Sequence, residues 1–222
     1  RLWRFPGPKG IATEIFTTPV TTPAPLVMQQ SGFVTGDSGM GLTHGTIAGM
    51  LTPPLKTSPR GIALIESFED FAATPYLCPA GKWTTGFGHV IRKSEPTLTK
   101  ARLSLVEARE LLRADLGTVE VFLNAVLPAG TAQFRFDALA ALVFNIGVGA
   151  FDTSTLLKRI KAGDLKGAEA EFAKWVFANG QRLRGLEIRR ACEAMMFGGC
   201  SDSTIANERA RLRATRPGRR YG

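Results

Sequence analysis

The segment EDFAATPYLCPAGKWTTGFGH contains an acid, a thiol and a hydroxyl within a short stretch of chain. Cys78 follows Glu69 by nine positions, and Thr84 follows Cys78 by six. Because Glu69 lies between two aromatic residues, Phe68 and Phe71, we expect burial to raise its pKa and to keep a proton available near neutral pH. A general acid for glycoside cleavage needs such a proton. The segment therefore contains residue types that acid-catalysed glycoside cleavage requires.

Each of these residues also has an ordinary structural explanation. Glu69 fits a solvated glutamate at a helix end, and composition does not separate it from Glu66 or Asp70. Taken alone, Cys78 fits a small buried residue and Thr84 an ordinary strand residue. Local sequence thus leaves both interpretations open.

Neither a metal site nor a cofactor site is predicted. His89 is a candidate base, or a residue that holds a loop or a buried acid in place by hydrogen bonds. The other histidine, His44, lies in a distant segment, so no pair of histidines has metal-ligand spacing. The sequence also contains no phosphate-binding glycine loop or nucleotide fingerprint. We therefore expect no metal and no cofactor.

Capping and breaking residues predict the elements that position the candidate site. Ser58 and Pro59 begin a helix that places Glu69 at its end. Two strand-like runs follow, 76–78 and 82–87, joined as a hairpin. The rest is helical, with a capping box at 104–107 and Thr131 as a further cap. Helices are expected at 105–127, after Thr131, at 154–162, at 165–177 and at 186–197.

This order of elements predicts an α+β fold with one small sheet near its start. Residues 1–59 hold eight of the thirteen prolines and ten threonines, but only six charged residues. We therefore expect an extended arm over 1–57, a folded domain over 58–200 and a basic tail over 201–222. The arm is either a plain linker or a segment docked on something larger.

The net charge of +9 favours polyanionic partners, namely nucleic acid, anionic lipid or an anionic cell envelope. The basic tail attracts the chain to such an envelope or serves nucleic-acid binding or assembly, although its few aromatic residues give poor support for base stacking. The sequence contains no run of 18 apolar residues, so no membrane-spanning helix is predicted. For the three cysteines, two states are open: Cys192 paired with Cys200 while Cys78 is a thiol, or all three reduced.

Three ordered segments together resemble a known family. The first is the Glu-x8-Cys-x5-Thr pattern followed by Gly-x-Gly-His; the second is FNIGVGAF followed by STLL; the third runs from Gly163-Asp164 to GLEIRR. The chain resembles the phage-type lysozymes, or endolysins, of glycoside hydrolase family 24 over about residues 58–200. The resemblance implies a lysozyme-like fold with a small hairpin lobe, a larger helical lobe and a cleft between them.

The resemblance also implies roles for individual residues. Glu69 is the general acid that cleaves the β-1,4 bond after N-acetylmuramic acid, and Thr84 holds the attacking water or the sugar. Cys78 stands where many members have Asp, and it acts as a nucleophile, a water-positioning group or an oxidisable switch. Substrate contact is expected for Asn145 and His89. The alternative for Asn145 is a helix-end cap.

Two arginines of the third segment, Arg189 and Arg190, complete the predicted site. They pair with Glu69 or contact the glycan and its peptide, and a solvated helix face is the alternative.

The expected partner is the peptidoglycan glycan strand. As an endolysin, the protein would act first in the host cytoplasm and then in the periplasm at lysis. The alternatives are a lysozyme carried in the virion, with residues 1–57 docked on phage tail proteins, and a lysozyme-like module that binds glycan without turnover. The start at Arg1 rather than Met fits a processed chain and favours the virion alternative. Specific nucleic-acid binding is the weakest interpretation.

Overall fold

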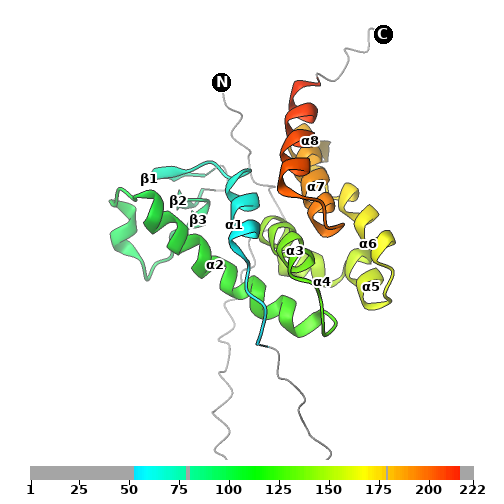
Figure 1. Ribbon diagram of the computed structural model, residues 1–222. Helices are drawn as coiled ribbons and strands as arrows, with labels where there is room; N and C mark the ends of the chain where they lie inside the picture. The colour runs from blue at the N-terminus through cyan, green and yellow to red at the C-terminus, as the bar shows by residue number, and fades with distance from the viewer. Residues whose placement is uncertain (1–52, 79–80, 179, 216–222) are drawn as a thin grey trace, which may run out of the picture. The chain divides into compact units, whose positions relative to one another are not determined.

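A computed structural model describes residues 53–78, 81–178 and 180–215 (Figure 1). Most of the predicted arm and the last seven residues of the predicted tail lie outside these ranges, as do residues 79 and 80 in the predicted hairpin turn. The described part combines helices with two small antiparallel sheets, so the α+β class is confirmed.

The helix that leads to the candidate acid is α1, Pro59–Glu66. Its start is as predicted, because the Ser58 side chain accepts a hydrogen bond from the Gly61 N–H and Pro59 occupies the first turn. It ends earlier than expected, and Glu69 lies three residues beyond its last residue. The Phe68 and Glu69 N–H groups both donate to the Ile65 carbonyl, at 2.9 and 3.1 Å. Glu69 is therefore held in a turn that continues from α1.

The first sheet has the order β1–β2–β3, with β1 at Ala72–Leu77, β2 at Trp83–Gly86 and β3 at His89–Val90. Strands β1 and β2 form the predicted hairpin, in which Tyr76 pairs with Thr84. The third strand was not predicted. It arises because Gly86 and Gly88 adopt positive φ angles of 61° and 89°, which reverse the chain between β2 and β3.

Helix α2, Leu105–Val126, begins with the predicted capping box between Ser104 and Glu107. The second predicted cap is wrong. Ala132 occupies the N-cap position of α3, Gln133–Ile146, and gives no side-chain hydrogen bond. The Thr131 hydroxyl instead donates to the Pro128 carbonyl at 2.7 Å, within the preceding loop.

The chain after α3 forms more helices than expected, and the first two of the expected helices are shorter than predicted. The helix expected at 165–177 ends early and gives way to a second hairpin, β4–β5. A final helix, which was not predicted, lies in the expected basic tail and packs on α7, with Ile205 in the buried core. These elements are α4 Val148–Asp152, α5 Thr155–Lys161, α6 Leu165–Glu171, β4 Phe177–Ala178, β5 Gln181–Arg182, α7 Arg184–Phe197 and α8 Asp202–Ala214, with 3₁₀ turns η1 Pro96–Thr99 and η2 Phe172–Lys174.

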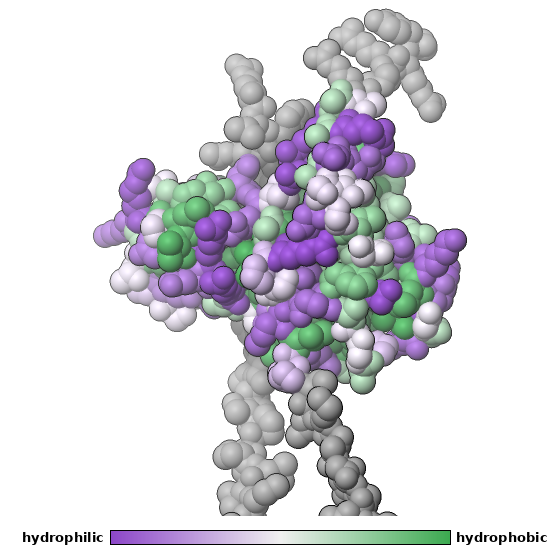
Figure 2. Space-filling view, in the orientation of Figure 1, coloured by the Kyte–Doolittle hydropathy of each residue, from purple (hydrophilic) through white to green (hydrophobic). Residues whose placement is uncertain are grey.

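Helix α3 forms the centre of the core. Every residue from Phe136 to Val143 is buried, so this helix is covered on all sides, and it packs against α1, α2 and α7. In Figure 1, α3 lies among these helices, while the first sheet lies at the other end of α2. On the face drawn in Figure 2, hydrophobic residues are scattered among hydrophilic ones.

The last residues of the predicted arm are bound to the domain. Asn124 of α2 hydrogen-bonds both the N–H and the C=O of Leu55, at 2.8 and 2.9 Å. Glu120 accepts from the Thr57 N–H at 2.8 Å, and buried Asp137 accepts from the N–H and hydroxyl of Ser58. These bonds fix the direction in which the chain enters α1. No helix in the described ranges is long and apolar enough to cross a membrane.

Candidate active site

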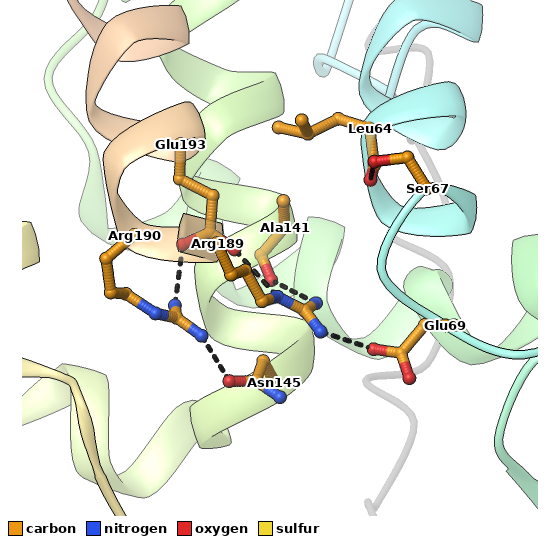
Figure 3. A network of polar contacts seen from close by, with 8 residues as sticks. All are labelled: Leu64, Ser67, Glu69, Ala141, Asn145, Arg189, Arg190 and Glu193. Atoms are coloured by element: carbon orange, nitrogen blue, oxygen red, sulfur yellow. Dashed lines mark hydrogen bonds and ion pairs between the residues drawn. The ribbon is translucent and has the colours of Figure 1, made fainter. Parts of the chain in front are cut away.

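A chain of buried polar side chains connects α7 to the turn that carries Glu69 (Figure 3). Arg189 donates from Nη1 to Glu69 Oε1 at 2.6 Å and from Nε to Glu193 Oε1 at 2.9 Å. Arg190 donates from Nη1 to Glu193 Oε2 at 2.6 Å and from Nη2 to Asn145 Oδ1. Both predicted arginines thus belong to one network, and Arg189 is the one that pairs with Glu69.

Burial and charge act in opposite directions on the two arginines. Burial tends to lower the pKa of Arg189, but the charges of Glu69 and Glu193 offset it, so the pKa is raised. Arg190 has only partial compensation from Glu193, and burial lowers its pKa to about 10. Both guanidinium groups therefore keep their positive charge at neutral pH, in an interior where Glu193 is completely buried.

The Glu69 side chain lies at the accessible end of this network. It is 23% exposed, whereas Arg189 and Glu193 are 5% and 0% exposed. Arg189 also donates to the Ala141 carbonyl of α3 at 3.3 Å, which ties it to the core. An ideal Cβ on Gly88 would lie 4.0 Å from Glu69 Oε2, so the β2–β3 turn passes close to the carboxylate. Glu69 is thus held by a rigid partner and is still accessible.

The thiol and the hydroxyl both belong to the β1–β2 hairpin. Cys78 directly follows β1 and is partly exposed, and its N–H donates to the Lys82 carbonyl at 2.9 Å. Thr84 is buried in β2, and its hydroxyl donates to the same Lys82 carbonyl at 3.2 Å. Since a hydroxyl that donates one bond keeps acceptor capacity, the Thr84 oxygen can still accept a hydrogen bond from a water molecule or a sugar.

His89 is buried, with 3% of its side chain exposed, and both of its ring nitrogens are engaged. Nδ1 lies 2.8 Å from Asp115 Oδ2 on α2, and Nε2 lies 3.0 Å from Glu95 Oε2 in the loop after β3. These contacts fit the alternative interpretation from sequence, in which His89 holds a loop in place. They leave no ring nitrogen for a glycan.

The sequence model of the phage lysozyme family matches residues 66–193, more than half of the chain. The chain belongs to the phage lysozyme family. An endolysin of Acyrthosiphon pisum secondary endosymbiont phage 1 is 40% identical over 144 residues, which cover 63% of this chain and 96% of that protein. A SAR-endolysin of Escherichia phage Mu is 38% identical over 129 residues, which cover 58% of this chain and 73% of that protein.

Solved structures agree with this family. The muramidase domain of SpmX from Asticaccaulis excentricus has a TM-score of 0.58 and 35% identity, covering 64% of this chain and 97% of that domain. The lysozyme-like fold expected from the sequence is therefore confirmed. As a member of the phage lysozyme family, the chain is a glycoside hydrolase of the muramidase type that degrades peptidoglycan.

Two residues that organise the site, Glu193 and Asp115, were not predicted from the sequence. Glu193 follows Arg189 by four positions and Arg190 by three, a spacing that favours contact on one helix face. That signal was present in the sequence. Asp115 carried no comparable signal, because only tertiary folding brings α2 against β3.

Cys192 lies within α7, and Cys200 lies between α7 and α8. Cys192 and Cys200 form no disulfide, which leaves the reduced alternative. Burial raises the pKa of the Cys192 thiol to about 11, so it is an unreactive thiol at neutral pH. Within the described ranges, no three residues of the types His, Cys, Asp and Glu are grouped so that they could hold a metal ion.

The environment of His89 predicts a dependence of stability on pH. The hydrogen bond to Asp115 is the largest cause that raises its pKa above 6.5; burial opposes it, and the charges of Asp115 and Glu95 add to it. A raised folded-state pKa stabilises the protein fully below 6.5, and this contribution is lost as pH rises through the folded-state value. Wild type should therefore be more stable than His89→Gln at low pH. We expect this difference in unfolding free energy to decrease as the pH rises from 6.5 through the folded-state pKa of His89. Chemical denaturation at several pH values measures it, and a difference that is constant with pH would contradict the prediction.

Proposed function

We propose that this muramidase cleaves the β-1,4 bond between N-acetylmuramic acid and N-acetylglucosamine, with Glu69 as the general acid. The observation that supports this role is positional: buried Arg189 fixes the orientation of the Glu69 carboxyl group, which is still partly exposed beside the β2–β3 turn. Because Oε1 accepts from Arg189, we assign the transferable proton to Oε2, on the side of Gly88. Glu69 donates that proton to the leaving glycosidic oxygen.

Thr84 and Cys78 act on the other reactant. Thr84 accepts a hydrogen bond from the attacking water or a sugar hydroxyl while its own hydroxyl donates a hydrogen bond to the Lys82 carbonyl. Cys78 occupies the position of the second acidic group. As a nucleophile it would give retention of configuration at the sugar carbon, and as a water-positioning group it would give inversion.

The side-chain amide of Asn145 is proposed to contact the glycan. Its Oδ1 atom is occupied by Arg190, and the amide nitrogen lies on the side away from that arginine (Figure 3). The nitrogen is then available as a donor to a sugar oxygen or an acetamido carbonyl. Arg190 is 1% exposed and acts on the substrate only through Asn145. Arg189 acts through Glu69.

The test combines analysis of the products with chemical blocking of the thiol. Purified peptidoglycan is digested by wild type and by Cys78→Asp, each with and without iodoacetamide, and the released fragments are analysed by mass. We expect fragments with N-acetylmuramic acid at the reducing end. Alkylation should lower the wild-type rate about a hundredfold, the lower end of acid–base effects, and leave Cys78→Asp unchanged.

The Cys78→Asp variant is a matched control, because it keeps Cys192 and Cys200. Fragments that end in N-acetylglucosamine, or release of peptide alone, would refute the bond assignment. Binding to the wall without any reducing sugar would favour the non-catalytic module. Equal loss of activity in both proteins on alkylation would remove Cys78 from the mechanism.

We further propose that the protein acts as an endolysin, made in the host cytoplasm and acting on the wall from the periplasm at lysis. The endolysin names of its relatives support this route. A virion-associated role, with residues 1–57 docked on tail proteins, is supported only by the composition of the arm, most of which lies outside the described residues.

A further inference from the structure

A cavity of about 200 Å³ lies in the helical part of the domain, apart from the Glu69–Arg189–Glu193 network. It lies between the loop that joins α2 to α3, the start of α3, the connection from α5 to α6 and the end of α7. In Figure 1, helices α5 and α6 are at the opposite end of the domain from strands β1–β3. Its walls are mainly apolar, with Leu139, Ile160, Leu165 and Phe197 among them.

One cation interrupts the apolar wall. The guanidinium of Arg135 lies over two aromatic rings, 4.9 Å from the centroid of Phe134 and 5.8 Å from that of Phe197. Its Nε atom is buried and has no hydrogen-bond partner among the residues that the structure describes. The nearby Arg159 pairs with Asp164 and Glu171, but no ion pair within the described ranges includes Arg135. The cavity therefore contains a guanidinium group that forms no ion pair with a carboxylate of the described residues.

The helix that carries Arg135 adds to this positive charge. It is the third residue of α3, and the N-terminus of a helix carries partial positive charge that favours anions over cations. No side chain caps this end of α3, because Ala132 occupies the N-cap position. An anion in the cavity would lie near both positive groups.

We propose that this cavity binds a small carboxylic acid that carries an apolar group. The carboxylate pairs with Arg135, whose planar guanidinium matches a carboxylate in shape. The apolar group lies against Leu139, Ile160 and Phe197. The cavity has room for one ring or a short chain, since an apolar cavity of about 150 Å³ accommodates benzene.

Four probes separate the two parts of the proposed recognition. Benzoate has both the charge and the ring, benzamide has the ring without the charge, acetate has the charge without the ring, and glycerol has neither. Binding is followed by NMR chemical-shift titration of the full chain. We expect saturable binding of benzoate in the millimolar range or tighter, and at least about tenfold weaker binding of benzamide and acetate.

Three variants locate the site on the protein. Arg135→Met keeps the length of the side chain and removes its charge, and it should weaken benzoate binding about tenfold or more. Ala129→Phe fills the exposed rim and leaves Arg135 intact, so it should weaken binding even if Arg135→Met is poorly folded. Arg113→Met removes the same charge from an exposed position on α2 and should bind like wild type.

Each outcome decides for or against the site. Failure of benzoate to saturate with wild type, or equal affinity for benzoate and benzamide, would overturn the proposal. So would wild-type affinity in a folded Arg135→Met protein or in Ala129→Phe. Glu69→Gln should bind benzoate normally, because the cavity shares no residue with the catalytic network, so a failed muramidase assignment would leave this result standing.

Discussion

Replacement of Glu69 by Gln should lower the rate of peptidoglycan hydrolysis at least about a hundredfold, because it removes the proton donated to the leaving oxygen. The fold should persist, since the glutamine carbonyl can still accept the hydrogen bond from Arg189, and Arg189 keeps its ion pair with Glu193. Loss of turbidity of permeabilised Gram-negative cells measures activity, and thermal unfolding monitors the fold.

Two neighbouring acids serve as matched controls. Glu66→Gln breaks the ion pair with Arg109, in which Oε1 lies 2.7 Å from the guanidinium, and Asp70→Asn changes an exposed residue. Both variants should keep activity within a few-fold of wild type. Wild-type lysis by folded Glu69→Gln, or a greater loss in either control, would remove Glu69 from the role of general acid.

The second large effect is expected from the buried end of the same network. Glu193→Ala should reduce the free energy of unfolding by about 3–5 kcal/mol, the typical cost of removing one partner from a buried ion pair. Glu193 is completely buried and accepts hydrogen bonds from both Arg189 and Arg190, so its loss leaves two buried charges undercompensated. Denaturant unfolding at constant pH measures the change.

A surface ion pair supplies the control for geometry. Glu208 and Arg211 have the same i,i+3 spacing and the same 2.6 Å distance as Arg190 and Glu193, but Arg211 is 65% exposed. Glu208→Ala should therefore shift the denaturation midpoint only slightly, because water screens the exposed pair. Similar shifts for the two variants would show that burial does not set the strength of the network.

In Glu193→Ala, activity should fall at temperatures where the protein is still folded, because Arg189 then holds Glu69 less firmly.

Local sequence predicted the elements whose signals lie within a few residues. The Ser58-Pro59 start and the Ser104–Glu107 capping box appear as expected because each depends on contacts within one helical turn. The predicted Thr131 cap is wrong because a competing contact is available within the same few residues. A hydroxyl near a helix start can satisfy a preceding carbonyl instead, and here it bonds to Pro128.

The missed elements depend on contacts between distant parts of the chain. Strand β3 has two residues and is stabilised by pairing with β2, so its own sequence carries little signal. Helix α8 is rich in arginine and was expected as part of a tail. Its packing on α7, with Ile205 buried, stabilises it as a helix.

The sequence by itself determined the family, the fold class and the spacing of Glu69, Cys78 and Thr84, because these depend on residue order. It also indicated Arg189 and Arg190 as candidate partners of Glu69, with a solvated helix face as the alternative. Only the tertiary structure decided between them, by burying Arg190 against Asn145 and leaving Arg189 within 2.6 Å of Glu69. Contacts across 120 positions of chain depend on how α3 and α7 pack, and no local pattern of residues specifies that packing.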